Sequence, residues 1–326
     1  MKISLNNFVI KKNKKKFLFT PGPTSLSLEN LVGLEACFGR GDNSYKKIQE
    51  KVLSKLKKLS GHKKIITLQG SGSLAIEIMC KNFLSGNVVV VNTGYYSDRV
   101  LSICKNLVKE KIIKNLFYVK WNKMNNFKAK KKISWVIGCP TETSKGLLVP
   151  IVDLKKFARN LNAKMMLDAT ASIGLEENHK LAQVISYSSC KGLCGLTGAS
   201  FVAYNLKPKY YKNSFYTNIF NHEQKKMTGP YHSILSLYNV LKNYKKFKQA
   251  ILNNKKKFLK KFGNYLIYKK INQPNICTFV TKKIKSKNKK VVLYQPRSSV
   301  NGSIISHLGE VHLKNKAKGK ILNYLY

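Results

Sequence analysis

Apolar residues recur at helical spacing in several stretches of this chain. Residues 42–60 place Ile, Val and Leu side chains on one helical face, and Gly61 follows as a stop signal. Residues 74–84 repeat the pattern directly after a glycine-rich turn, and residues 97–109 and 153–161 carry shorter versions of it. The spacing predicts a helix over each of these ranges.

Continuous apolar runs lie between these helical patterns. The clearest is VVVVN at residues 88–92, which is typical of a strand buried on both faces of a parallel sheet. Strands that alternate with helices predict an α/β fold with a mainly parallel sheet. The further strand candidates are residues 135–139, 164–168, 184–189 and 200–205.

The pattern changes after Thr228. A long, lysine-rich helical segment follows, with room for one break, and the last sixty or so residues hold short apolar runs that suit a small α+β unit. A chain of 326 residues is also long enough for two cores. We therefore predict an N-terminal arm over residues 1–20, a large domain over 21–245 and a small domain over 246–326.

Composition narrows the class of protein. A hydrophobic content of 43% indicates a globular protein, and no run approaches the ~18 apolar residues of a membrane span. The N-terminus lacks the apolar centre of a signal peptide, and the seven cysteines form neither a disulfide framework nor a paired zinc motif. We expect a soluble protein of a reducing compartment, the cytoplasm, with no membrane partner and no metal.

The net charge of +47 raises the possibility of nucleic-acid binding. Only four of the 61 basic residues are arginine, however, and the 57 lysines are scattered rather than gathered in one recognition element. A protein that reads phosphates or bases is expected to use the planar fork of arginine more often. We therefore expect no nucleic-acid partner.

A glycine-rich turn, LQGSGS at residues 68–73, connects an expected strand to an expected helix. Glycine lets the backbone approach a ligand closely, and the start of the helix offers free N–H groups to an anion. Ser71 and Ser73 add hydroxyl donors. The turn has neither the dinucleotide fingerprint nor the P-loop ending, so it suits a single phosphate better than a nucleotide.

Asp168 and Lys191 stand out for different reasons. Asp168 ends an apolar strand, where an aspartate either caps the next turn or faces a ligand at the carboxyl edge of the sheet. Lys191 lies among Cys, Ser and Gly residues, where it is either one more lysine of a lysine-rich chain or a reactive amine in a cramped pocket. A phosphate turn, a strand-end carboxylate and an enclosed lysine, in this order, are what pyridoxal 5'-phosphate requires.

The chain also resembles a known family. It is similar to the class V aminotransferases of fold type I, in the branch of the alanine–glyoxylate, serine–pyruvate and 2-aminoethylphosphonate–pyruvate transaminases. The resemblance runs from residue 19 to residue 311 in family order. Its motifs are FTPGPT, LQGSGSLAIE, NTGYYSDR, PTETSKGLLVPI, DATASIG, SSCKGLCGLTGASFV, TGPYHSILSLYNVL and ISHLGEV.

The resemblance implies roles for the first candidates. Lys191 matches the lysine that forms the Schiff base with the cofactor and then moves the proton. Asp168 matches the partner of the pyridine nitrogen. Ser71, Gly72 and Ser73 match the cup that holds the cofactor phosphate.

It implies further contacts as well. Tyr96 matches the aromatic residue that stacks on the cofactor ring, although it also suits a core position, and Thr143 matches a hydroxyl near the phenolic oxygen. Gly22 falls where the N-terminal segment lines the substrate pocket. Thr228 matches a residue that reaches the phosphate of the neighbouring subunit, which implies a homodimer with composite sites.

Three positions depart from the family pattern. Cys190 stands where a Gln or Asn often donates to the phosphate. Lys225 stands where a tyrosine is expected, and its charge can still pair with the phosphate. Ile304 occupies the position of the arginine that clamps the substrate carboxylate, and an isoleucine cannot hold an anion. Either Arg297 or a lysine replaces that arginine, or the substrate carries no carboxylate there.

The sequence thus favours a pyridoxal-phosphate aminotransferase. It would move an amino group between a donor, such as a small amino acid or a 2-aminoethylphosphonate-like amine, and a keto acid or aldehyde. The alternatives with the same fold are a lyase, a decarboxylase and a transaminase for amino-sugars or amino-aldehydes. A non-catalytic basic binding protein is the alternative from another class.

Overall fold

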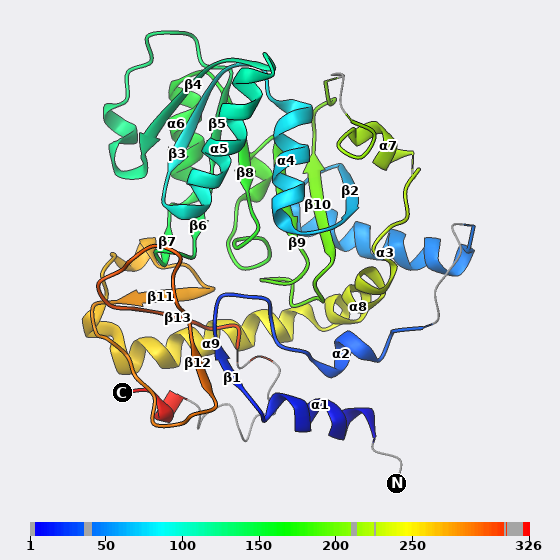
Figure 1. The fold of residues 1–326 in the computed structure, drawn as a ribbon, viewed down its shortest axis with the longest axis vertical. Helices are drawn as coiled ribbons and strands as arrows, with labels where there is room; N and C mark the ends of the chain where they lie inside the picture. Colours follow the sequence, from blue (N-terminus) through cyan, green and yellow to red (C-terminus); the bar gives the residue numbers. More distant parts are fainter. Residues whose placement is uncertain (1–3, 36–40, 210–213, 225, 310, 312–321) are drawn as a thin grey trace.

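A seven-stranded sheet forms the centre of the molecule in the computed structural model, which describes residues 4–35, 41–209, 214–224, 226–309, 311 and 322–326 (Figure 1). The strand order is β2-β10-β9-β8-β5-β3-β4. The strands are β2 (Lys64–Gln69), β3 (Gly86–Asn92), β4 (Ile113–Lys120), β5 (Trp135–Gly138), β8 (Lys164–Asp168), β9 (Val184–Ser188) and β10 (Ala199–Tyr204).

The sheet is parallel except at β10, which is antiparallel to both β2 and β9. The reason is the short connection between β9 and β10, which comprises residues 189–198. A parallel crossover needs a dozen or more residues, so a loop of this length turns the next strand back. The predicted α/β fold with a mainly parallel sheet is confirmed.

Helices cover both faces of the sheet because successive strand residues point in opposite directions. Val88 and Val90 pack with the helices α4 and α5, whereas Val89 and Val91 pack with α3, α6 and α8. Each face is thus a separate hydrophobic core, and together they make three layers (Figure 1). The helices are α3 (Asn43–Ser60), α4 (Gly72–Phe83), α5 (Tyr95–Lys109), α6 (Ile151–Asn160) and α8 (Tyr231–Lys242).

Local signals fix the ends of α3 as expected. The Asp42 side chain accepts hydrogen bonds from the backbone N–H groups of Ser44 and Tyr45, and Gly61 ends the helix in the left-handed conformation with φ 74°. The long helical segment after Thr228 does break, between α8 and α9 (Tyr244–Phe262).

Two of the longer elements were not expected from the hydrophobic pattern. β4 is an edge strand in which Lys114, Tyr118 and Lys120 are exposed, and α1 (Leu5–Asn13) is a short helix with only Val9 buried. Shorter elements complete the chain. They are α2 (Leu28–Leu31), α7 (Ile219–Glu223), β6 (Thr141–Glu142), β7 (Leu147–Leu148) and five 3₁₀ turns at Trp121–Asn126, His179–Leu181, Gly263–Tyr265, Lys270–Asn272 and Leu322–Tyr324.

A second region packs around α9, below the sheet in Figure 1. It contains β11 (Cys277–Val280) antiparallel to β13 (Ser303–Ser306), and β12 (Val291–Leu293) parallel to β1 (Phe17–Phe19). The pairing of β1 brings the N-terminal segment onto this region, where Phe19 packs against Phe258 and Ile305. The division proposed at residue 245 falls in the first turn of α9 and stays a prediction.

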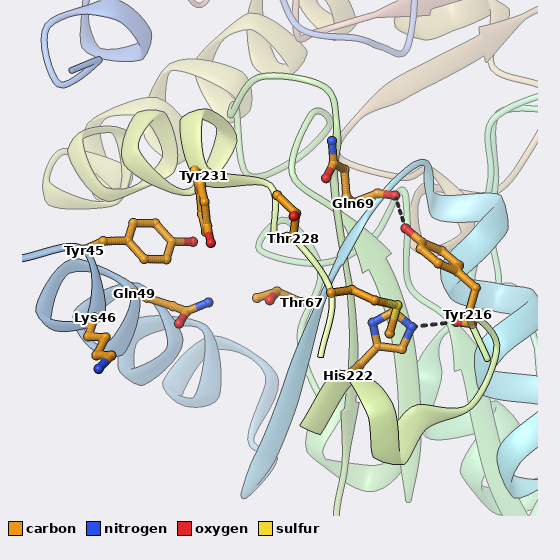
Figure 2. A pocket seen from close by; sticks show the side chains of 11 residues that line it. Tyr45, Lys46, Gln49, Thr67, Gln69, Tyr216, His222, Thr228 and Tyr231 are labelled. Atoms are coloured by element: carbon orange, nitrogen blue, oxygen red, sulfur yellow. Dashed lines mark hydrogen bonds between the residues drawn. The ribbon is translucent and has the colours of Figure 1, made fainter. Parts of the chain in front are cut away.

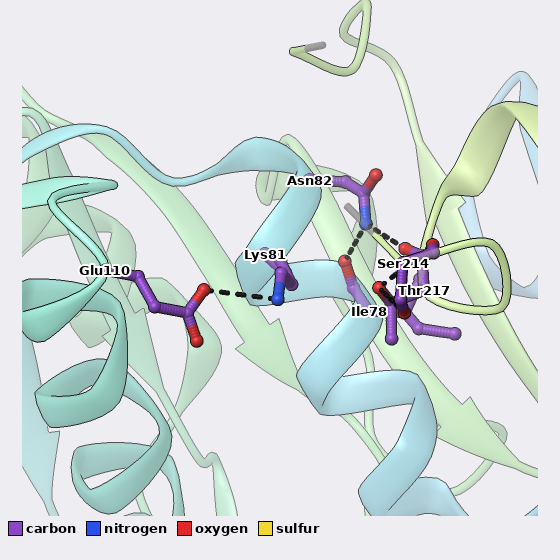
Figure 3. Close-up of polar contacts among 6 residues, drawn as sticks. All are labelled: Ile78, Lys81, Asn82, Glu110, Ser214 and Thr217. Atoms are coloured by element: carbon purple, nitrogen blue, oxygen red, sulfur yellow. Dashed lines mark hydrogen bonds and ion pairs between the residues drawn. The ribbon is translucent and has the colours of Figure 1, made fainter. Parts of the chain in front are cut away.

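Polar side chains tie α4 to its neighbours (Figure 3). The Asn82 amide donates to the carbonyl oxygens of Ile78, at 2.7 Å, and Thr217, at 2.8 Å. Lys81 forms an ion pair with Glu110 at 3.1 Å, just beyond the end of α5. Within the described segments, every helix is too short or too polar to cross a membrane.

Candidate active site

A large pocket opens at the carboxyl ends of the parallel strands, between the sheet and the second region. Its volume is about 750 Å³, which is within the usual size of a site for a cofactor and a small substrate. The sheet contributes Asp168 at the end of β8 and Lys191 after β9, and the second region contributes residues 294–297 after β12. The start of α4, with Ser71, Gly72 and Ser73, forms another wall.

The start of α4 is shaped to receive an anion. Ser71 precedes the helix, and its side chain makes no capping hydrogen bond, so its hydroxyl is available to a ligand. A Cβ at Gly72 would lie 2.9 Å from Thr170 Oγ1 and 3.0 Å from Thr170 Cγ2. A side chain at this position would therefore displace Thr170. The hydroxyls and the free N–H groups of the first helical turn together make a phosphate cradle.

Asp168 lies buried on the floor of the pocket, with 4% of its surface exposed. Its Oδ1 accepts a hydrogen bond from the backbone N–H of Thr170 at 3.0 Å, and the thiol of Cys139 donates to Oδ2 at 3.9 Å. No ion pair with Asp168 occurs among the residues that the structure describes. A carboxylate that is held in place without a cation suits a protonated ring nitrogen.

Lys191 projects into the same pocket from the loop between β9 and β10. Its Nζ lies 5.2 Å from the centre of the Tyr96 ring. The N-terminal segment supports this loop, because Thr24 N–H donates to the Cys190 carbonyl at 2.9 Å and a Cβ at Gly22 would lie 3.0 Å from Lys191 Cγ. The absence of a side chain at Gly22 therefore leaves room for the lysine.

Gly192 is a second position where the lysine loop has no space. A Cβ there would lie 2.4 Å from the backbone oxygen of Ile173 and 2.9 Å from Leu175 Cγ. We expect Gly192→Ala to lower the free energy of unfolding by roughly 1–3 kcal/mol and to displace Lys191. Urea unfolding measures the first effect. The control is Gly263→Ala, where nothing lies within 4 Å of the new Cβ, and equal stability of the two variants would contradict this prediction.

Glu142 is a buried acid that the sequence did not single out. Its carboxylate accepts hydrogen bonds from the Tyr96 backbone N–H at 2.9 Å and from the Ser144 hydroxyl at 2.6 Å. Burial raises the pKa of Glu142, and these hydrogen bonds act against that rise. Glu142 thus fixes the first turn of α5, which carries Tyr96. Its neighbour Thr143 lines the pocket with a buried hydroxyl that has no partner among the described residues.

Tyr95 and Arg99 were also not predicted as site residues from the sequence. Both lie in the first turns of α5, and Arg99 Nη1 donates to the Ser73 hydroxyl at 2.7 Å. Arg297, which the sequence did suggest, lines the pocket and donates to the Tyr95 hydroxyl at 3.3 Å. The available signal was that Arg99, in NTGYYSDR, is one of only four arginines.

Thr228 lies apart from the lysine. It lines a second, smaller pocket beside α3 and the start of α8, together with Tyr45, Gln69 and Tyr216 (Figure 2). One chain therefore does not bring Thr228 to Lys191. Lys225 lies outside the described residues.

Of the other two positions that depart from the family pattern, one lines the pocket and the other is buried in a core. Cys190 lines the main pocket, half-buried, with its sulfur 3.8 Å from the Ser188 hydroxyl. Ile304 is 1% exposed and packs in the core around α9, so it has no access to a substrate. The anion-binding position of the resemblance is therefore closed in this chain.

Three independent features of the pocket fit pyridoxal phosphate. They are the phosphate cradle at α4, the unpaired carboxylate of Asp168 and the amine of Lys191, all of which line one cavity. The buried hydroxyl of Thr143 adds a donor for an oxygen of the ring.

Comparisons with curated proteins point to the same group. A 2-aminoethylphosphonate–pyruvate transaminase of Pseudomonas aeruginosa is 26% identical over 197 residues, covering 57% of this chain and 53% of that protein. The matched region thus spans about half the length of that relative. The enzyme of the same name from Bacillus cereus is 23% identical and covers 90% of this chain and 93% of its own length. No protein-family model matches the chain.

Solved structures share the fold over nearly the whole chain. An alanine–glyoxylate aminotransferase from Nostoc superposes with a TM-score of 0.77 at 14% identity, covering 95% of this chain and 94% of that one. A Thermus thermophilus aspartate aminotransferase gives a TM-score of 0.75 at 17% identity, with coverages of 94% and 97%. The chain is therefore a fold type I protein and a relative of the class V pyridoxal-phosphate aminotransferases.

Proposed function

We propose that the chain is a pyridoxal-phosphate aminotransferase. It moves the amino group of a small amino acid, or of an amine like 2-aminoethylphosphonate, to a keto acid or aldehyde. The observation that carries the proposal is the shared pocket of Lys191, Asp168 and the α4 phosphate cradle. The names of the curated relatives support the same reaction.

When bound, pyridoxal phosphate supplies an aldehyde that links to amines and a ring that withdraws electrons from the substrate. Ser71, Ser73 and the first N–H groups of α4 would hold its phosphate. Asp168 keeps a proton on the ring nitrogen, because a buried carboxylate with no other cation stabilises that positive charge. Lys191 Nζ would hold the aldehyde carbon.

Lys191 also serves as the base. When its Nζ is free, it would take the proton from the substrate carbon that bears the nitrogen and would later give that proton back. The Tyr96 ring lies beside this amine, and the Glu142 carboxylate holds the turn that carries the ring. The absence of a side chain at Gly22 leaves room for the aliphatic part of Lys191.

We also propose a homodimer. Thr228 lines a pocket on a different part of the chain from Lys191, which is the arrangement expected if it serves the partner's cofactor phosphate. Cys190 would give the phosphate only a weak donor. A cytoplasmic location stays a prediction from the sequence.

Steady-state kinetics test the reaction. With 2-aminoethylphosphonate as donor and pyruvate as acceptor, or with alanine as donor and glyoxylate as acceptor, the new amino acid should appear only when both substrates are present. Because one site serves both halves, the double-reciprocal plots should be parallel. Formation of carbon dioxide or of an elimination product without an acceptor would favour a decarboxylase or a lyase instead.

A further inference from the structure

Two guanidinium groups line the main pocket without a carboxylate partner. Arg99 comes from α5, and Arg297 comes from the segment after β12. In the part of the chain that the structure describes, the ion pairs are Lys64 with Glu223 and Lys81 with Glu110, so neither arginine is neutralised. An unpaired pair of arginines in a pocket is a site for an anion.

Tyr95 connects the two arginines. Its hydroxyl accepts a hydrogen bond from Arg297 Nη1 at 3.3 Å. The guanidinium carbons of Arg297 and Arg99 lie 5.4 Å and 5.7 Å from the centre of its ring. Hydrogen bonding from Arg297, and then from Arg99, lowers the pKa of the Tyr95 phenol. The phenol thus holds two like charges close together.

Arg99 is fixed on its other side as well. Nη1 donates to the Ser73 hydroxyl at 2.7 Å, and the guanidinium lies 5.2 Å from the centre of the Tyr96 ring. One N–H on Ser73 leaves donors of the guanidinium free to reach a ligand. Because Arg99 lies between Ser73 of the phosphate cradle and Tyr95, its free donors line the same pocket as Lys191.

The charge of the fitting ligand follows from this arrangement. Two guanidiniums held around one phenol repel each other, and a ligand with two negative charges relieves that repulsion better than a single carboxylate does. A group with three oxygens can also accept from both forks at once. A tetrahedral dianion, phosphonate or phosphate, meets both conditions.

We propose that Arg99, Tyr95 and Arg297 form a substrate subsite that selects a dianionic phosphonate or phosphate group at the end of the substrate remote from the amine. Arg99 and Arg297 contact the anion, and Tyr95 is the positioning residue that aligns them. The subsite rests on the proposed aminotransferase function. It replaces the anion-binding position that Ile304 closes.

Binding of unreactive analogues tests the subsite without turnover. Ethylphosphonate, ethanesulfonate and propionate share an ethyl group, but at mildly alkaline pH only ethylphosphonate carries two charges. Their affinities for protein saturated with pyridoxal phosphate are measured at this pH by calorimetry. Ethylphosphonate should bind at least about tenfold more tightly than the other two, because each charge-assisted contact favours it. The advantage should disappear at a lower pH, where one proton converts the dianion to the monoanion.

Substitutions test which residues are responsible for the selectivity for ethylphosphonate. Arg99→Met and Arg297→Met should each weaken ethylphosphonate binding roughly tenfold to a hundredfold and leave propionate nearly unchanged. Tyr95→Phe keeps the ring and removes only the hydroxyl, and it should reduce the ratio between ethylphosphonate and ethanesulfonate. Arg159→Met is the control, because Arg159 is exposed near the end of α6. The Arg159→Met protein should bind all three ligands like the wild type.

The results separate this subsite from other roles of Arg99. If Arg99→Met weakens pyridoxal phosphate and all three analogues by the same factor, Arg99 acts only through Ser73 and the subsite is wrong. Equal affinity of the wild type for the three analogues also overturns it. Selective binding without any amino transfer would leave the subsite standing and remove the aminotransferase function. Amino transfer without selection by charge would leave the aminotransferase function standing and would overturn the subsite.

Discussion

Lys191→Ala is expected to abolish the visible absorption band of the protein reconstituted with pyridoxal phosphate. It is also expected to lower turnover at least about 10³-fold, because one amine provides both the covalent link and the base. The fold should persist, since the Lys191 side chain lines the open pocket. Absorption spectra measure the band, a steady-state assay measures the turnover, and circular dichroism measures the fold.

The control for this variant is Lys63→Ala. Lys63 is exposed just before β2, at the amino end of that strand, whereas the pocket lies at the carboxyl ends of the strands. The Lys63→Ala protein should keep both the band and the turnover. A Lys191→Ala protein that retains the visible band would show that another lysine holds the cofactor.

Asp168→Asn is expected to lower turnover by about 10²–10³-fold while the protein still binds pyridoxal phosphate through Lys191. Asparagine keeps the shape and accepts the Thr170 N–H, but it carries no charge to hold a proton on the ring nitrogen. The electron-withdrawing state of the ring is then lost, so the step that removes the substrate proton slows. Stopped-flow measurement of that step, with a deuterated donor, reports it directly.

Asp153→Asn serves as the matched control, because Asp153 is an exposed acid in the first turn of α6. It should react at the rate of the wild type. If Asp168→Asn also reacts at that rate, the charge of Asp168 has no part in the chemistry and the assignment fails.

Long elements with strong hydrophobic periods could be predicted from the sequence. The helix over 42–60 and the strand VVVVN were found because their buried residues repeat without interruption. β4 was missed because an edge strand buries fewer side chains and because Asn115 and Leu116 interrupt the alternation of apolar and polar residues. The direction of β10 depends on the length of the loop before it rather than on its own residues.

The site divides in a similar way. Lys191 and Asp168 could be found because each sits in an unusual local setting of the sequence, and the structure places both in one pocket. Glu142 and Arg99 could not, since their importance comes from contacts with residues on other elements, Tyr96 and Ser73. The resemblance suggested Thr228 as a contact to a second chain, and no single chain can test that contact.

The most direct test of the central claim is a single turnover of the purified protein with pyridoxal phosphate bound and one amine donor added. The account predicts that the visible band of the bound aldehyde disappears and that one keto acid or aldehyde product forms per site. A keto acid acceptor, added afterwards, should restore the band. A band that no amine changes, or that returns without an acceptor, would contradict amino transfer at Lys191.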